Sequence, residues 1–213
     1  NDDIENLVLS GNEEYIAYSD DNNRIYFMEA KTNELLWTST APDSTMSSLA
    51  LSHNGRYLVA GSNDDSLYFF DTSSSTPVWS YDTGQGVNSV SISADGEYIT
   101  AGSSSSKLYF FDKDSNEPEW IHTIDDGCKP NVIAMSSNGE YITMGSSGGA
   151  SNNCDVYLFD SEYTDEEPLW TSGVSCGNTC SVYSIDMSSD GEYIAAGGDS
   201  YLYFFDKDSG TPE

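Results

Sequence analysis

Apolar and polar residues alternate in short runs along the whole chain, and turn residues separate the runs. In the segment that begins at Ser89, Val90 and Ile92 alternate with serine, and Asp95-Gly96 follows. A period of two is typical of a strand with one buried face. Asp-Gly between apolar runs indicates a hairpin, because both residues accept positive φ. We therefore predict two antiparallel strands joined by a tight turn in this segment.

The segment continues with an aromatic run over residues 108–112, an acidic turn and Trp120. Aromatic and β-branched residues at this density favour strands over helices. The whole unit recurs along the chain, and the tyrosines that open its second strand are 42, 41, 43 and 52 residues apart, at Tyr15, Tyr57, Tyr98, Tyr141 and Tyr193. A repeat of about 40 residues with four strands is typical of a propeller blade.

The predicted fold is an all-β β-propeller of four-stranded antiparallel blades. Radial packing of such sheets buries their faces and protects their edges. We predict one propeller region over 1–213, with four complete blades and three strands of a fifth, at approximately 5–40, 47–82, 88–124, 131–172 and 183–213. The spacing from acid to tryptophan places the next tryptophan just after Glu213, so we expect this sequence to be part of a larger propeller.

Two recurrent positions are interpreted as structural. The tryptophan at the end of each blade is expected to pack between neighbouring sheets, and the acid after the third strand to accept N–H groups of its own turn. A calcium site at these acids is the alternative, because Ca²⁺ takes several converging oxygen ligands. The predicted structural positions are Trp37, Trp79, Trp120, Trp170, Asp71, Asp112, Asp160 and Asp206.

The charge balance narrows the classes of partner. The chain has 7 Lys and Arg against 36 Asp and Glu, a formal net charge of -29. Such a surface repels nucleic-acid phosphates and anionic membranes, so we expect neither as a partner. No apolar run is long enough to span a bilayer, and we expect no direct membrane insertion. The acids are interpreted as a solvated surface; the alternative is a face that binds cations or a basic partner.

Blade four departs from the repeat and carries the cysteines. Its loop between the second and third strands, Ser146 to Asp155, is longer than in the first three copies. The alternating strand direction places this loop and the loops between blades on one rim. The cysteines expected on that rim are Cys128, Cys154, Cys176 and Cys180. The candidate binding residues there are Ser146, Asn152, Asn153, Asp155 and Asn178.

Four cysteines allow three disulfide connectivities. The preferred interpretation is two local disulfides, Cys128 with Cys154 and Cys176 with Cys180, which favours an extracytoplasmic location, secreted or at the cell surface. A zinc site and buried unpaired thiols remain as alternatives. Of the two histidines, His53 lies in a turn and His122 follows Trp120, and neither is placed for a catalytic relay. We predict no catalytic, metal-binding or cofactor-binding residue.

The stretch from Glu29 to Trp37 resembles the Asp-Ala-x-Thr-Gly-x-x-x-Trp motif of pyrroloquinoline quinone-type, or quinoprotein-like, propeller repeats. The Ser-x-Asp-Gly-x-Tyr-Ile-x-x-Gly-Ser pattern, followed by Leu-Tyr-Phe-Phe-Asp, resembles WD-repeat-like propellers of prokaryotic, often archaeal, surface proteins. Quinone binding in the quinoprotein family depends on a central Ca²⁺ and a vicinal disulfide. This chain has no adjacent Cys-Cys pair, so we expect no bound cofactor.

These observations favour a non-enzymatic binding or scaffold propeller that presents the loops of one rim to a protein or glycan partner. One alternative is an enzyme, a hydrolase, lyase or oxidoreductase, with its site at the central channel and partly in blades beyond this sequence. Another is a structural component of a surface or filament. Propellers host many unrelated activities, so the repeat itself does not choose among them.

Overall fold

A computed structural model describes residues 3–124, 127–148, 154–162, 167–174, 181–198 and 201–212. The first two sheets contain β1 (Ile4–Leu9), β2 (Tyr15–Asp20), β3 (Ile25–Glu29), β4 (Glu34–Ser39), β5 (Met46–Leu51), β6 (Tyr57–Ser62), β7 (Ser66–Asp71) and β8 (Trp79–Asp82). The third and fourth contain β9 (Val87–Ile92), β10 (Tyr98–Ser103), β11 (Lys107–Asp112), β12 (Trp120–Thr123), β13 (Lys129–Met135), β14 (Tyr141–Ser147), β15 (Cys154–Asp160) and β16 (Trp170–Val174). The fifth contains β17 (Val182–Met187), β18 (Tyr193–Gly198) and β19 (Leu202–Asp206).

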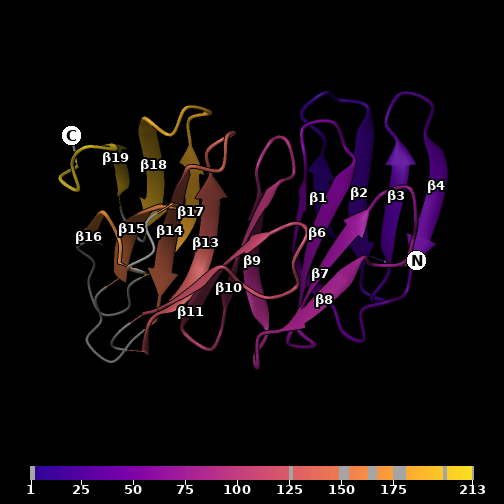
Figure 1. Ribbon diagram of the computed structural model, residues 1–213, viewed down its shortest axis with the longest axis horizontal. Helices are drawn as coiled ribbons and strands as arrows, with labels where there is room; N and C mark the ends of the chain where they lie inside the picture. The colour runs from indigo at the N-terminus through magenta and orange to yellow at the C-terminus, as the bar shows by residue number, and fades with distance from the viewer. Residues whose placement is uncertain are drawn as a thin grey trace.

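The sheets confirm the predicted fold class. Strands that follow one another in sequence pair antiparallel, giving four sheets of four strands and one of three in the described part of the chain. The sheets succeed one another in chain order from the indigo to the yellow end of the molecule (Figure 1). The first strand of each sheet contacts the first strand of the next, so the sheets fan out from these strands as propeller blades do.

The hydrophobic core is divided into layers, one between each pair of neighbouring sheets. Successive side chains of a strand point to opposite faces of its sheet. In the central strands both faces carry apolar side chains, one face for each neighbouring sheet. In the second sheet Leu58 and Phe70 pack towards the first sheet, whereas Val59 and Phe69 pack towards the third. Corresponding layers join the third sheet to the fourth and the fourth to the fifth. Each sheet is therefore held by side chains of the next blade as well as by its own strand pairing.

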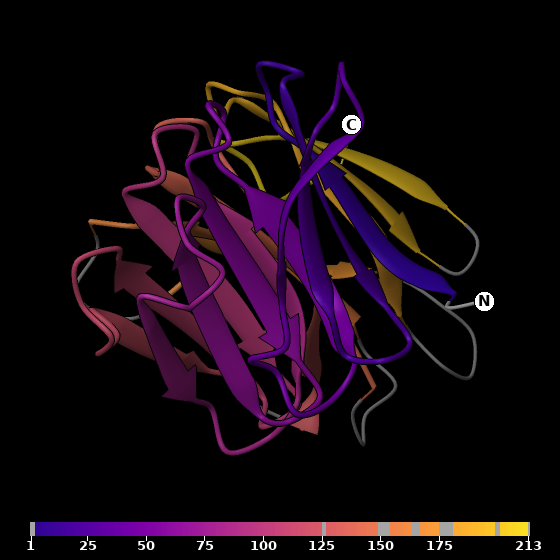
Figure 2. The same cartoon turned by 90° about the vertical axis from the view of Figure 1, so that its right-hand side faces the viewer.

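The outer faces of the first and last described sheets show the same pattern without a neighbour against them. Leu67 in β7 and Leu108 in β11 are both 0% exposed, whereas Leu202, at the matching position of β19, is 80% exposed. On β1 of the first sheet, Leu7 is 64% exposed. The first and last sheets lie at opposite sides of Figure 1, and Figure 2 views the molecule from the side of the first sheet.

One rim of the molecule is built from tight turns. We call it the turn rim; it comprises the turns between first and second strands at 10–14, 52–56, 93–97, 136–140 and 188–192, and those after third strands. Backbone hydrogen bonds link successive blades here: His53 N donates to Ala94 O at 2.8 Å, Ala94 N to Ser137 O at 2.9 Å, and Ser137 N to Ser189 O at 2.9 Å. The rim thus has a regular spacing set by the backbone.

The opposite rim carries the loops between second and third strands and the loops between blades. We call it the loop rim; its described loops include those near Asn63, Gln85 and Ser104. Here the backbone hydrogen bonds join two loops of the same blade: Asn63 N donates to Thr45 O at 3.0 Å, and Ser104 N donates to Gly86 O at 2.9 Å. Antiparallel pairing makes the two rims distinct surfaces, which matters for where a partner can bind.

Candidate functional site

A stacked column of aromatic rings runs through each of the first three blades. In the third blade the Tyr98 and Phe110 ring centroids are 5.5 Å apart, and those of Phe110 and Trp120 are 5.1 Å apart with an interplanar angle of 12°. The same order of Tyr, Phe and Trp is found in the first and second blades. The rings come from the second, third and fourth strands, so strand pairing sets the column directly.

The tryptophan of each column also bonds to the next blade. Trp37 Nε1 donates to Thr72 O at 2.7 Å, and Trp79 Nε1 donates to Lys113 O at 2.8 Å. Trp120 and Trp170 donate in the same way to Ser161 O and Lys207 O, at 3.2 and 2.7 Å. All four acceptors directly follow the recurrent acid. The structure therefore places the four tryptophans between neighbouring blades, each with a backbone partner across the interface.

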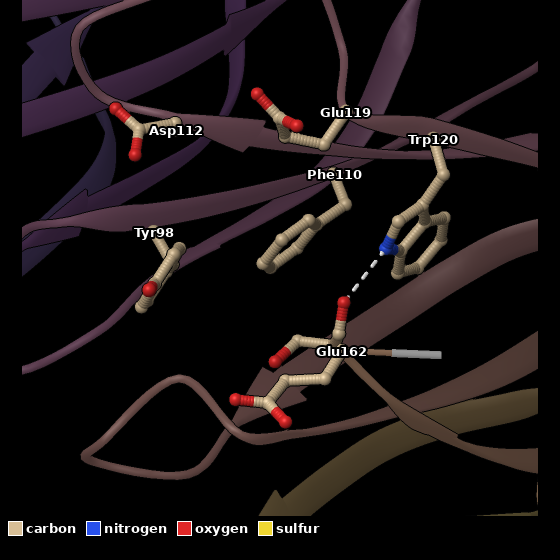
Figure 3. Close-up of a pocket in the computed structure, with 7 residues that line it drawn as sticks. Tyr98, Phe110, Asp112, Glu119, Trp120 and Glu162 are labelled. Atoms are coloured by element: carbon tan, nitrogen blue, oxygen red, sulfur yellow. Dashed lines mark hydrogen bonds between the residues drawn. The ribbon is translucent and has the colours of Figure 1, made fainter. Parts of the chain in front are cut away.

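A pocket of about 460 Å³ opens beside the column of the third blade (Figure 3). Its described lining comes from two blades: Tyr98, Phe110, Asp112, Glu119 and Trp120 of the third, and Ser161 and Glu162 of the fourth. Phe110 and Trp120 are buried, and Glu119 and Glu162 are exposed at the edge. Three carboxylates and no basic side chain are present among these described lining residues. A cavity with aromatic walls and an acidic mouth suits a cationic group with an apolar stem.

A similar pocket of about 450 Å³ lies between the first and second blades, but its charges differ. Arg56 lines it together with Asp71, and the Arg56 Nε lies 3.4 Å from Asp71 Oδ2. Burial alone raises the pKa of Asp71, but hydrogen bonds from Ser73 and Arg56 outweigh it and hold that pKa below its usual value. This pocket therefore already contains a cation of its own chain.

The recurrent acids lie at the start of the turns that follow the third strands. Asp71 accepts a hydrogen bond from Ser73 N at 3.1 Å, and Asp112 accepts one from Asp114 N at 2.8 Å. Asp160 and Asp206 accept from Glu162 N and Asp208 N, at 3.0 and 2.9 Å. In the described residues no group of three or more His, Cys, Asp or Glu converges closely enough to hold a metal ion.

The strands of the fourth blade extend further into the predicted binding loop than the sequence indicated. Ser146 lies in β14 and is 0% exposed, and its Oγ accepts a hydrogen bond from Asp155 N at 2.9 Å. Asp155 lies in β15 and is half-buried. The assignment of these two residues to the loop was wrong, because this hydrogen bond continues the contact between the two strands. Asn152, Asn153 and Asn178 lie outside the described residues.

The cysteines are only partly described. Cys128 is buried directly before β13, and its Sγ lies 3.1 Å from the carbonyl oxygen of Gly148, on the loop rim. Cys154 is the first residue of β15. Cys176 and Cys180 lie outside the described residues, and both proposed disulfides stay predictions.

The two histidines lie in different environments. His53 is exposed in its turn, and its backbone takes part in the hydrogen bonds of the turn rim. His122 packs edge-on against Phe159, with ring centroids 5.0 Å apart.

Among the residues that the structure describes, no helix has the length and apolar character needed to cross a bilayer.

The pocket was not predicted from the sequence. Trp120 and Asp112 were expected to have structural roles, and Glu119, Ser161 and Glu162 were not among the candidate residues. The available signal was the residue after each recurrent acid, which is Thr72, Lys113, Ser161 or Lys207 in successive blades. At the interface between the third and fourth blades this residue is Ser161, whereas Lys113 and Lys207 occupy the matched position at the interfaces on either side.

Comparison with known proteins supports the repeat assignment. A search of curated proteins gives no match. Among solved structures the chain is similar to the Kuenenia stuttgartiensis hydrazine synthase, with a TM-score of 0.76 and 17% identity, over 90% of this chain and 54% of that one. It thus spans about half of that chain, and at this identity the likeness shows the fold alone. A family model described as outer membrane protein assembly factor BamB matches residues 5–212. Since that match covers nearly the whole chain, this protein belongs to the BamB family of PQQ-like β-propeller repeat proteins.

Proposed function

We propose that this chain is a non-enzymatic binding propeller that acts outside the cytoplasm and presents its turn rim to a protein partner. The observation that carries the proposal is the pocket between the third and fourth blades, which has aromatic walls and an acidic mouth. The family description names an assembly factor of the outer membrane, which supports both a protein partner and a location in the cell envelope.

The framework around the pocket supports binding without a large rearrangement. Trp120 is held by stacking on Phe110 and by its hydrogen bond to Ser161 O, so the two walls of the pocket are fixed to each other. A site that is formed before the partner arrives loses little conformational entropy on binding. The net charge of -29 favours a partner with basic side chains and disfavours nucleic acid.

We place the contact on the turn rim, whereas the sequence analysis favoured the loop rim of the fourth blade. The pocket opens among turn-rim residues, and Ser146 of the predicted loop is buried. A protein is preferred over a glycan because carboxylates around an aromatic wall match a basic side chain. The two rims can be compared directly by experiment, because exposed positions are available on both.

A photocrosslinking residue at the position of Glu117, exposed on the turn rim, tests the proposal against one at the position of Gln85, exposed on the loop rim. The crosslinks would be made in cell-envelope fractions of the source organism. We expect a discrete protein adduct from Glu117 and none from Gln85. Adducts from Gln85 alone would overturn the choice of rim. Binding to a glycan array without any protein adduct would overturn the choice of partner.

A further inference from the structure

The interfaces between blades differ at one matched position, the residue after the recurrent acid. Its backbone is held alike in the second to fifth blades: the N–H groups of Thr72, Lys113, Ser161 and Lys207 donate to carbonyls within their own blades at 2.8 to 2.9 Å. Their carbonyls accept from the tryptophan of the preceding blade. The four backbone positions are therefore equivalent, and the interfaces differ by side chain.

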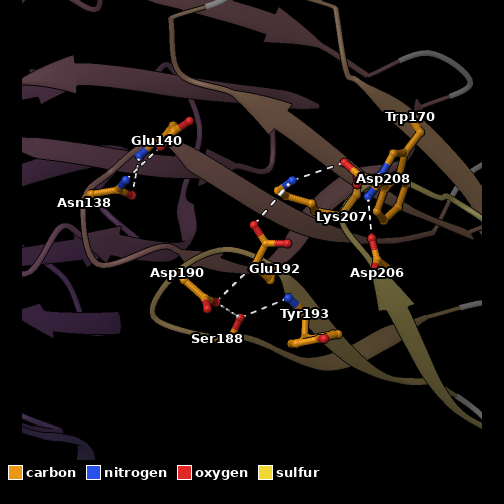
Figure 4. A network of polar contacts seen from close by, with 10 residues as sticks. All are labelled: Asn138, Glu140, Trp170, Ser188, Asp190, Glu192, Tyr193, Asp206, Lys207 and Asp208. Atoms are coloured by element: carbon orange, nitrogen blue, oxygen red, sulfur yellow. Dashed lines mark hydrogen bonds and ion pairs between the residues drawn. The ribbon is translucent and has the colours of Figure 1, made fainter.

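Where this residue is lysine, its ammonium group is bound by two carboxylates of its own blade. Lys207 Nζ lies 3.4 Å from Glu192 Oε1 and 3.2 Å from Asp208 Oδ1 (Figure 4). It also lies 5.9 Å from the centroid of the Tyr141 ring in the preceding blade, within the range of a cation–π contact. The hydrogen bond to Asp208, then that to Glu192, raises the pKa of Lys207.

The second lysine repeats this arrangement in the third blade. Lys113 Nζ lies 2.8 Å from Asp114 Oδ2 and 3.1 Å from Glu97 Oε2. Glu97 and Glu192 directly precede the tyrosines that open the second strands, and Asp114 and Asp208 lie two positions after the recurrent acid. Two independent copies of the repeat therefore use the same carboxylate positions to hold a primary ammonium group.

The fourth blade keeps the carboxylates and lacks the lysine. Glu140 occupies the position of Glu97 and Glu192, Glu162 that of Asp114 and Asp208, and Ser161 that of the lysine. Glu140 accepts a hydrogen bond from Asn138 Nδ2 at 2.8 Å, and Glu162 has no ion pair among the described residues. The pocket opens at this interface, with Tyr98 at the position of Tyr141 (Figure 3).

We propose that the pocket between the third and fourth blades binds the ammonium group of a lysine side chain from a partner protein, in the place that Lys113 and Lys207 fill at the neighbouring interfaces. This proposal rests on the proposed function for the partner being a protein, whereas the binding of an ammonium group is argued from the pocket itself. The aliphatic stem would pack against Phe110 and Trp120, and Glu162 would pair with the ammonium group. The first two blades offer no such site, because Arg56 already supplies a cation there.

The probe is Nα-acetyl-L-lysine N-methylamide, and its neutral counterpart is Nα-acetyl-L-norleucine N-methylamide. Binding is followed through the indole N–H signal of Trp120 in two-dimensional NMR, assigned with Trp120→Phe. We expect the lysine probe to shift this signal saturably and the norleucine probe to leave it nearly unchanged. Equal shifts with the two probes would overturn the proposal, because the pocket would then select only an apolar chain.

The decisive variant is Ser161→Lys, which places the chain's own ammonium group in the pocket. It should weaken binding of the lysine probe at least about tenfold, because the carboxylates are already paired. Thr72→Lys is the matched control, since it adds the same charge at the equivalent position of another interface, and it should bind as the wild type does. Unchanged binding by a folded Ser161→Lys would overturn the proposal.

If Ser161→Lys does not fold, Glu162→Gln takes its place and should weaken binding roughly threefold, as expected for loss of one exposed charge partner. Unchanged binding by this variant would overturn the assignment of Glu162. The probe requires no protein partner, so its binding can succeed even if the crosslinking experiment fails. A turn-rim adduct that Ser161→Lys leaves intact would support the proposed function and contradict the lysine site.

Discussion

Trp170 Nε1 donates a hydrogen bond to the carbonyl oxygen of Lys207, 2.7 Å away in the next blade. The same lysine lies over the ring of Tyr141, which belongs to the blade of the tryptophan. One residue thus meets its neighbouring blade twice, through its backbone and through its charge. At the interface between the third and fourth blades, Ser161 O accepts the matching hydrogen bond from Trp120, but the serine side chain carries no charge.

The tryptophan contact has a measurable contribution to stability. Trp79→Phe keeps an aromatic ring next to Phe69 and removes the donor that Lys113 O accepts from. We expect a loss of about 1 to 3 kcal/mol in the free energy of unfolding, because a partly buried carbonyl loses its partner and the smaller ring leaves space. Urea unfolding followed by circular dichroism measures this loss. An unchanged midpoint would mean that water replaces the indole without penalty.

Leu67 and Leu202 form a matched pair for the contribution of the layers between blades. Leu67→Ala should cost about 2 to 5 kcal/mol, because it opens a cavity between the second and third blades. Leu202→Ala removes the same atoms from an 80% exposed side chain and should stay within about 0.5 kcal/mol of the wild type. Thermal unfolding of both variants checks the difference. Equal losses would show that the outer face of β19 is covered in the sample.

Two glycines separate backbone strain from steric overlap. Gly96 and Gly84 have φ of 83° and 76°, so alanine is strained at either position. A Cβ at Gly96 would lie 2.3 Å from Cδ2 of Tyr57, whereas one at Gly84 meets no atom within 4 Å. Gly84→Ala should cost about 1 kcal/mol. Gly96→Ala should cost clearly more, because Tyr57 must move; equal melting temperatures for the two variants would contradict this.

The lowered pKa of Asp20 in the folded protein predicts that stability depends on pH. Burial raises the pKa of Asp20, but the hydrogen bond from the Tyr26 hydroxyl, 2.8 Å, and those from Arg24 N and Asn22 N, each 3.0 Å, hold it below its usual value. A lowered pKa in the folded state gives stability that is complete above the unfolded value of about 3.9. That stability is lost as the pH falls through the folded value.

Tyr26→Phe removes the side-chain donor and tests this dependence. The melting temperature of this variant should lie below that of the wild type at about pH 7, where Asp20 is ionised in both states. The gap should narrow towards about pH 2, where the carboxylate is protonated. A gap of constant size across this range would show that Tyr26 stabilises the sheet by packing and not through the charge of Asp20.

The fold was predictable because its signals are local and repeated. The alternation at Val90 and Ile92 predicts a strand, and Asp95-Gly96 predicts the turn after it. Five copies of the pattern make an error in one copy unimportant. The exact strand ends in the fourth blade were not predictable, because a hydrogen bond from Asp155 N to Ser146 Oγ extends the contact across residues that look like a loop.

The site was harder to predict because it is formed by two blades. Glu119 and Ser161 are 42 positions apart, and neither departs from the composition of its own turn. What distinguishes this interface from those on either side is Ser161, because Lys113 and Lys207 stand at the matched positions there, and the difference is seen only when the repeats are aligned. The cysteines and the long loop of the fourth blade stand out in the sequence by residue type, but residue type does not show which side chains of two blades enclose a pocket.

The backbone hydrogen bonds on both sides of Ser161 have a consequence for how such a chain can diverge. Because these bonds do not involve the side chain, a substitution at this position alters the pocket between two blades and leaves the spacing of the blades unchanged. Duplication of a blade would then supply a new interface at a fixed distance from the last one. The positions after the recurrent acids can therefore vary independently, and one replacement can open or fill a pocket between two blades while the backbone framework stays the same.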